Sequence, residues 1–191
     1  MAAAGTGVAA ALAFGLLDGA RGSPDGKPSQ ASPSAGSTAP PDPRFKVIPD
    51  QLTGSSSYPG HGPVRAFDGL KETWWGPGLS GAGRGEWIEA RFNTPIRLTD
   101  LVFTSGPSAR ATSRADTSLP HRVAVTITTA AGKTVKRELA LDAVLVDQHR
   151  KFDADEVTSV RFTIVSSYNA SEDTQVAINE IGFLTDTDAP A

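Results

Sequence analysis

The 191-residue sequence contains no cysteine. This absence excludes disulfide bonds, Cys-ligated zinc and a cysteine nucleophile. Without disulfide cross-links, any folded domain in this chain must draw its stability from its own core. The absence does not assign a compartment, because a cysteine-free chain is compatible with all of them.

Positive charge is also scarce. The chain has 18 Lys and Arg against 21 Asp and Glu, which gives a formal net charge of −3, and its basic residues form no cluster. Proteins that bind nucleic acids electrostatically carry a basic patch or stripe. The sequence therefore predicts no nucleic-acid partner.

Motifs of catalysis are missing as well. There is no Gly-x-Ser-x-Gly elbow and no His-Glu-x-x-His helix, and the histidines His61, His121 and His149 are far apart. His149 lies in a charged stretch that predicts a solvated turn. Gly76–Gly81 spells a dinucleotide fingerprint, but it has no preceding strand and Pro77 removes an amide. We interpret it as a loop and predict no enzyme and no cofactor; an unrecognised hydrolase formed by distant residues is the remote alternative.

Residues 1–20 are mostly small or apolar. The run is shorter than the roughly 20 residues that span a bilayer, and no basic region precedes it as in a signal peptide. It is interpreted as the outer end of a membrane helix or as a signal-like segment, with a frayed or buried Ala-rich helix as the alternative. Residues 21–44 are rich in Pro and Ser and predict a disordered linker. Together they predict an extracytoplasmic domain, membrane-anchored or secreted, with the N-terminal segment as its membrane tether.

The folded domain is predicted over residues 45–186, followed by a disordered tail at 187–191. Alternating apolar residues and turn signals indicate an all-β fold. Asn93-Thr94-Pro95 is expected to separate the first two strands, and a break of phase near Asp100 predicts a bulge. The predicted strands are Glu86–Phe92, Ile96–Thr104, Arg122–Thr129, Thr134–Leu141, Val157–Ser166 and Val176–Leu184.

Between Gln51 and Gly85 the chain has little periodicity, which predicts a long functional loop region. It contains Ala66-Phe67-Asp68-Gly69, then Thr73-Trp74-Trp75, and is followed by Gly85-Glu86-Trp87 and by Ala177–Phe183. This set resembles the discoidin-like family, also called coagulation-factor type C or galactose-binding-like domains.

The resemblance is greatest to the translocation (glycan-binding) domain of secreted NAD glycohydrolases, in its actinobacterial form. Thr158–Ile164, Ser167-Tyr168 and Asp173-Thr174 are similar to that subgroup. The family implies a jelly-roll β-sandwich whose loops at one end bind sugars, lipids or proteins without catalysis.

Aromatic side chains near the loops are the candidates for a binding site. Trp75 and Trp87 are interpreted as core residues. Neighbouring side chains in an extended backbone point in opposite directions, so Trp74 is expected to be exposed and to stack on a sugar. Other candidates near the loops are Tyr58, His61, Tyr168, Arg84, His121, and an arginine of the Gly106–Pro120 loop, either Arg110 or Arg114.

Asp68 and Glu180 have two interpretations. The family resemblance implies that they help to bind a structural calcium ion, which needs six to eight oxygen ligands. Leu70, however, stands where such loops often carry a second acidic residue. From the residues themselves, Asp68 is expected to cap the turn at Gly69 by accepting bonds from backbone amides.

The leading hypothesis is a non-catalytic carbohydrate-binding module, which binds a glycan through an aromatic face and a few fixed polar groups. The alternative is an interaction or sensor module that uses the same loops to hold an envelope protein.

Overall fold

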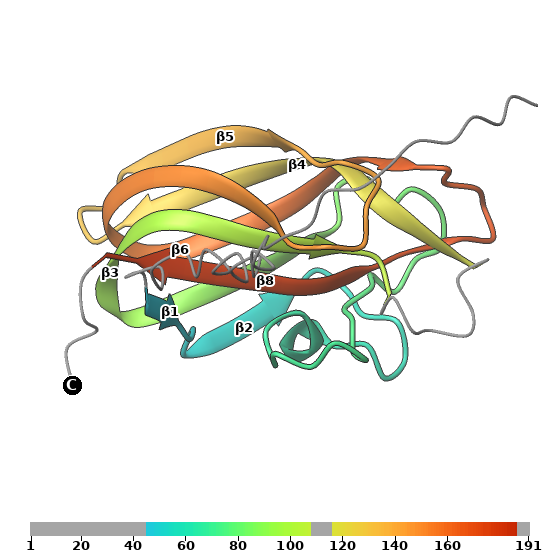
Figure 1. Cartoon of the computed structure of the whole chain (residues 1–191), viewed down its shortest axis with the longest axis horizontal. Helices are drawn as coiled ribbons and strands as arrows, with labels where there is room; N and C mark the ends of the chain where they lie inside the picture. Colours follow the sequence, from blue (N-terminus) through green and yellow to red (C-terminus); the bar gives the residue numbers. More distant parts are fainter. Residues whose placement is uncertain (1–44, 108–115, 187–191) are drawn as a thin grey trace, which may run out of the picture. The chain divides into compact units, whose positions relative to one another are not determined.

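Antiparallel β-strands make up most of the structure, a computed structural model that describes residues 45–107 and 116–186 (Figure 1). These residues belong to one compact unit. The elements are β1 (Phe45–Val47), β2 (Gln51–Gly54), a short 3-10 helix η1 (Pro63–Ala66), β3 (Trp87–Ser105), β4 (Thr117–Thr129), β5 (Thr134–Ala140), β6 (Gln148–Tyr168), β7 (Gln175–Val176) and β8 (Ile178–Thr185).

The strands form two layers because β3 and β6 are long and bend together. The strand order is β1-β8-β3-β6-β4-β5, with β2 also paired to β3. Residues Trp87–Arg91 of β3 pair with the second half of β6, and Ile96–Phe103 pair with its first half. A register shift separates Arg91 from Ile96, and bulges of this kind let a strand change direction. The expected break at residues 93–95 is therefore a bend within one strand.

Aromatic side chains join the two layers. The ring of Phe162 on β6 lies 6.2 Å from that of Phe103 and 6.1 Å from that of Phe183 on β8. All three side chains are at most 1% exposed. This arrangement confirms the predicted all-β sandwich.

The alternating pattern of the sequence corresponds to the core. Val123, Val125 and Ile127 on β4 are at most 1% exposed, and so are Val160 and Ile164 on β6. The predicted hairpin is present as β4 and β5, and its turn contains Gly132 at a φ of +73°, a conformation that glycine adopts without strain. A register shift between Leu98 and Asp100 agrees with the predicted bulge.

Three local expectations were wrong. His149 lies within β6, paired with Val102, and not in a turn. The last strand is divided, because β7 pairs in parallel with β4 before β8 begins. The stretch after Gln51 contains β2 and η1 and is not wholly irregular.

The long connections gather at one end of the sandwich, on the right in Figure 1. Since β3 folds back on itself, both of its ends lie there, next to the connections 55–86, 141–147 and 169–174. The bend of β3 and the β4–β5 turn lie at the opposite end. The part of the chain that the structure describes has no helix long and apolar enough to cross a bilayer. The predicted segment 1–20, linker 21–44 and tail 187–191 fall outside it.

Candidate ligand-binding site

Three of the residues proposed from the sequence meet at the loop end. The ring centroids of His61 and Trp74 are 3.6 Å apart, with 28° between the planes. The ring of Tyr58 lies 6.2 Å from Trp74 at an angle of 18° and 5.5 Å from His61. We call Tyr58, His61 and Trp74 the aromatic cluster.

The position of Trp74 follows from its neighbour in the chain. Trp75 is 0% exposed, and its backbone exchanges two hydrogen bonds with Ile178, of 2.8 and 2.9 Å. Because consecutive side chains of an extended backbone point in opposite directions, burial of Trp75 directs Trp74 away from the core. The sequence prediction for Trp75 is confirmed.

Backbone contacts hold the other two rings against Trp74. The Nδ1 atom of His61 lies 3.1 Å from the carbonyl oxygen of Trp74. The amide of Tyr58 donates to the carbonyl of Gly76 at 2.8 Å, and the amide of His61 donates to the carbonyl of Tyr58 at 2.9 Å. Since a carbonyl only accepts, Nδ1 carries the proton in this contact.

The exposure of the cluster differs from the prediction. Tyr58 is 44% exposed, but Trp74 is half-buried, as is His61. The expectation of a bare Trp74 ring was therefore wrong in part, because His61 covers one of its faces. The cluster thus combines three ring systems with the polar groups of a phenol and an imidazole.

A polar clamp that the sequence reasoning missed fixes the loops around the cluster. The carboxylate of Glu86 accepts hydrogen bonds from the hydroxyls of Ser55, at 2.6 Å, and Ser56. The Ser56 hydroxyl accepts in turn from the amide of Gly78 at 2.8 Å, and the Ser56 carbonyl accepts from Nε1 of Trp75 at 3.3 Å. These residues form no recognisable sequence motif, because Ser56 and the residues that it contacts from Trp75 onward are far apart in the chain.

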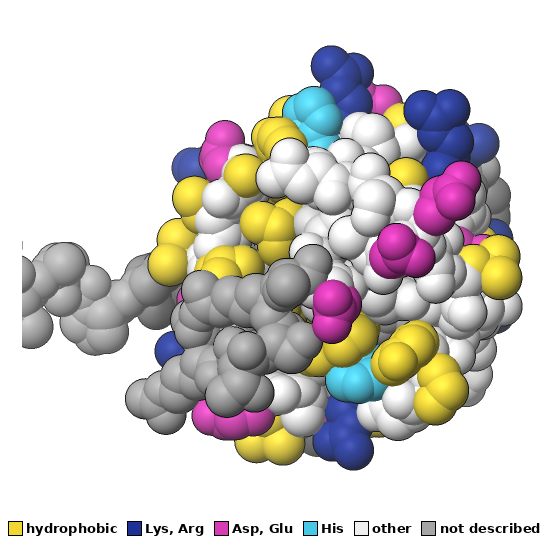
Figure 2. All heavy atoms as spheres, turned by 90° about the vertical axis from the view of Figure 1, so that its right-hand side faces the viewer, with side chains coloured by type: hydrophobic (Ala, Val, Ile, Leu, Met, Phe, Trp, Pro, Cys, Tyr) yellow, Lys and Arg dark blue, Asp and Glu magenta, His cyan; other side chains and the backbone are white. Residues whose placement is uncertain are grey.

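Other predicted residues lie elsewhere. Tyr168 packs on His121, with ring centroids 4.3 Å apart, and its hydroxyl donates to the carbonyl of Leu141. The Arg84 guanidinium donates to the carbonyl of Val165. Figure 2, which faces the loop end, shows histidine side chains at two separate places, each beside hydrophobic side chains. The remaining candidates, Arg110 and Arg114, fall outside the described residues.

The prediction that Trp87 lies in the core was wrong. It is half-buried and its ring lies under the guanidinium of Arg161, 3.9 Å from centroid to Cζ. Residues alternate between the two faces of a strand, so Ile88 takes the core position, at 0% exposure. Trp87 therefore belongs to the outer face of the sheet.

Asp68 and Glu180 both contact the turn at Gly69. Oδ1 of Asp68 accepts from the amide of Leu70 at 3.0 Å and from the hydroxyl of Thr73 at 2.7 Å. Glu180 accepts from the amide of Gly69 at 3.1 Å and from the Lys46 ammonium at 2.9 Å. Asp68 thus caps the turn as expected from the residues.

The donor set around these carboxylates does not fit a calcium ion. An amide, a hydroxyl and an ammonium all point their protons at the oxygens that calcium would need. The described residues also contain no group of three or more acidic or histidine side chains placed to hold a metal. In this structure both oxygens of Glu180 and Oδ1 of Asp68 accept from protein donors.

We expect calcium to leave the stability of this protein unchanged. The midpoint of thermal unfolding, followed by circular dichroism, should agree within about 1 °C between millimolar calcium and excess EDTA, because a ligand stabilises only the state that it binds. The Glu180→Gln variant controls for the carboxylate and should respond to neither condition. An increase of several degrees in calcium for the wild type alone would show that Asp68 and Glu180 rearrange around an ion.

Sequence comparison assigns the family. The profile of the NAD glycohydrolase translocation F5/8 type C domain matches residues 52–184. The chain belongs to this family. The match spans all strands except β1 and includes both the aromatic cluster and the Gly69 turn. No curated protein gives a significant match.

Comparison with solved structures identifies the fold of this chain. The family 32 carbohydrate-binding module of Clostridium perfringens NanJ, solved with galactose, superposes with a TM-score of 0.58 at 15% identity, covering 74% of this chain and 99% of that one. The F5/8 type C domain of a Bacteroides fragilis protein gives 0.57 at 18% identity, covering 75% and 97%. A family 32 module of a Clostridium perfringens family 89 glycoside hydrolase, solved with a GalNAc-galactose disaccharide, gives 0.52 at 13%, covering 70% and 93%. The predicted galactose-binding-like jelly roll is confirmed.

Proposed function

We propose that this protein is a non-catalytic carbohydrate-binding module that holds a glycan at the aromatic cluster, outside the cytoplasmic membrane. The observation that carries the proposal is the stack of Trp74, His61 and Tyr58 at the loop end. Sugars bind such sites by packing their apolar faces on rings while a few polar groups fix their orientation.

The physical properties of the cluster suit a sugar. The rings are rigid, so little side-chain entropy is lost on binding, and the Glu86 clamp holds their loops in place before a ligand arrives. The Tyr58 hydroxyl and Nε2 of His61 provide hydrogen-bonding groups for sugar hydroxyls. Solved relatives of the same fold bind galactose and a GalNAc-galactose disaccharide, which supports a hexose of this kind as the first ligand to test. The apolar segment 1–20 and the linker 21–44 support display away from a membrane.

Replacing Trp74 by alanine should abolish most glycan binding. The full chain is screened on a glycan array, and the affinity for the best glycan is then measured by calorimetry. By analogy with nucleic-acid bases stacked on aromatic side chains, loss of one stacking ring costs roughly 1–3 kcal/mol, which corresponds to a decrease in affinity of about five- to 150-fold.

Leu79→Ala provides the matched control, because Leu79 lies in the neighbouring loop and is 66% exposed without belonging to the cluster. Its affinity should equal that of the wild type. If Trp74→Ala bound the same glycan with wild-type affinity, the aromatic cluster would not be the site.

A second candidate function is a protein-interaction module of the cell envelope, which one other feature favours. A cleft of about 880 Å³ lies between the loops 69–72 and 145–147. Its apolar residues Leu70 and Val146 are 51% and 64% exposed, and exposed apolar surface is often an interaction site. A silent glycan array, with a purified envelope protein bound by the wild type and not by Val146→Asp, would favour this function.

A further inference from the structure

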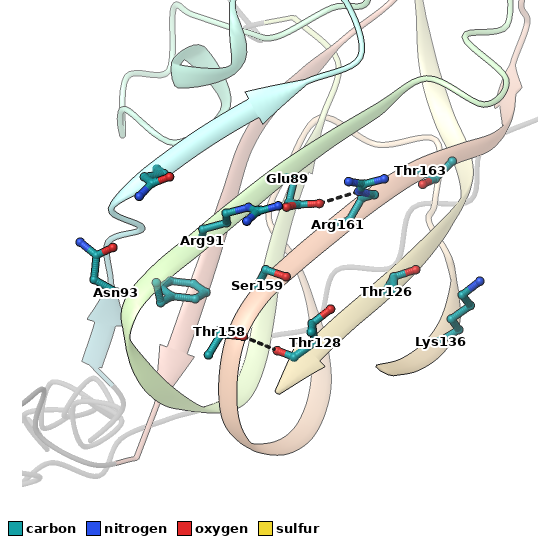
Figure 3. A pocket seen from close by; sticks show the side chains of 12 residues that line it. Glu89, Arg91, Asn93, Thr126, Thr128, Lys136, Thr158, Ser159, Arg161 and Thr163 are labelled. Atoms are coloured by element: carbon teal, nitrogen blue, oxygen red, sulfur yellow. Dashed lines mark hydrogen bonds and ion pairs between the residues drawn. The ribbon is translucent and has the colours of Figure 1, made fainter. Parts of the chain in front are cut away.

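The outer face of one layer of the sandwich is a polar trough of about 750 Å³ (Figure 3). It crosses β2, β3, β6, β4 and β5 and lies on the strands, whereas the aromatic cluster lies on the loops. Sheet faces directed to solvent are ordinarily polar. This one is distinguished by the arrangement of its charges.

Strand register aligns the polar side chains of the trough in rows. In one row Glu89 of β3 pairs with Arg161 of β6, then Thr126 of β4, then Lys136 of β5. In the next row Arg91 of β3 pairs with Gln51 of β2 and Ser159 of β6. Because side chains alternate along a strand, both rows project from the same face of the sheet, as Figure 3 shows.

Glu89 organises the charges of the trough. Its side chain is only 5% exposed and accepts from Nε of Arg91 at 2.7 Å and from Nε of Arg161 at 2.6 Å. The guanidinium of Arg161 also lies over the Trp87 ring, with Cζ 3.9 Å from the ring centroid. Charge-assisted bonds of this kind fix the orientation of a guanidinium. The terminal nitrogens of both arginines have no further hydrogen-bond partner among the described residues and are available to a ligand.

The trough is positive on a chain whose net charge is negative. Arg91, Lys136 and Arg161 oppose the single carboxylate of Glu89, and the other lining residues are uncharged, mostly threonine, serine and amide side chains. Lys136 stands two strands from Arg161, a separation of about 9–10 Å at the usual strand spacing. Positive charges are thus placed at both sides of a surface lined by hydroxyl groups.

We propose that this trough binds an acidic polysaccharide, with Arg91, Arg161 and Lys136 recognising carboxylates of successive sugars. Guanidinium groups bind carboxylates in pairs of parallel hydrogen bonds, and the hydroxyl-bearing residues both donate to and accept from sugar hydroxyls. Bases of a nucleic acid would need aromatic platforms, but here Arg161 covers Trp87 and Phe92 is 5% exposed. The site is separate from the aromatic cluster and does not depend on the function proposed for that cluster.

The test compares oligogalacturonate with its fully methyl-esterified form, in which the same sugars carry no charge. Calorimetry on the full chain should show binding of the acid and none of the ester, and the affinity should fall as salt is added. The double variant Arg91→Gln with Lys136→Glu should bind the acid at least about tenfold more weakly, because it removes one cation and reverses another.

Two control variants separate this site from the rest of the molecule. Lys71→Glu makes the same charge reversal as Lys136→Glu, but at an exposed lysine of the other cleft, and should bind oligogalacturonate like the wild type. Trp74→Ala should also bind it normally. Since Lys136 is exposed, Lys136→Glu alone keeps the fold and should weaken binding in the same direction.

Any of several results would overturn the proposal. These are no binding of oligogalacturonate, equal affinity for the methyl ester, wild-type affinity in the double variant, or equally tight binding of a single-stranded oligonucleotide of the same charge. Loss of binding in Trp74→Ala would also overturn it, because that result would assign the acid to the aromatic cluster. The glycan-array experiment on Trp74 and this experiment can therefore fail independently.

Discussion

Replacing Trp75 by alanine is expected to decrease the free energy of unfolding by about 3–5 kcal/mol, the range observed for large aromatic residues in cores. Trp75 is 0% exposed, and its backbone joins the long loop to β8 through Ile178. Its indole also donates to the carbonyl of Ser56. The variant therefore loses packing and leaves a partly buried carbonyl without its donor. Urea denaturation followed by circular dichroism measures the change.

The neighbouring tryptophan is the appropriate comparison. Trp74 is half-buried, so Trp74→Ala should cost at most about 1–2 kcal/mol of stability, less than full burial of an aromatic side chain contributes. It should lose glycan binding instead. Equal losses of stability in the two variants would contradict the division of roles between a core ring and a ligand-facing ring.

Replacing Gly76 by alanine is expected to disrupt the aromatic cluster although none of its three aromatic residues is changed. A Cβ at this position would lie 2.5 Å from Cζ3 of Trp74 and 2.8 Å from the carbonyl oxygen of Val176. The carbonyl belongs to β7 and cannot move away easily, so the indole or the loop must shift. Overpacking of this kind costs about 1–3 kcal/mol. We expect glycan affinity to fall as far as in Trp74→Ala, with a change in the near-ultraviolet circular dichroism of the free protein.

Gly62 provides the control for this change. It lies beside His61, its φ is −68°, and a Cβ there would meet no atom within 4 Å. Gly62→Ala should keep both the affinity and the aromatic spectrum of the wild type. If Gly76→Ala also kept them, the indole would have room to relax and the cluster would be less constrained than its contacts indicate.

The sequence predicted most of the core because burial leaves a periodic signal. Val123, Val125 and Ile127 alternate with polar residues, and each is at most 1% exposed. The different environments of Trp74 and Trp75 were predictable because neighbouring side chains of an extended chain point in opposite directions. The same reasoning failed for Trp87, because its apolar character gave no sign that Arg161, 74 positions later in the chain, would lie over its ring.

The candidate sites were predictable only in part. Tyr58, His61 and Trp74 are close in sequence within one loop region, so their residue types and location were enough to propose them together. Tyr168 is a tyrosine near a loop, as Tyr58 is, yet its ring packs on His121 and not in the cluster. Residue type alone does not distinguish the two tyrosines, because the contact that places Tyr168 comes from His121 on another strand, β4.

The sequence by itself determined the all-β class, the alternating core and the family, because each depends on local pattern or on the order of short motifs. Only the tertiary structure decided that His61 covers Trp74, that Lys46 and Gly69 occupy the oxygens of Glu180, and that Glu89 holds two arginines in one trough. The physical reason is that each contact joins segments far apart in the chain. In the trough the contact depends on strand register, because a cross-strand pair places Glu89 beside Arg161, and a shift of one position would turn Glu89 to the other face. At the loop end it depends on how the connection 55–86 folds back on itself and onto β8.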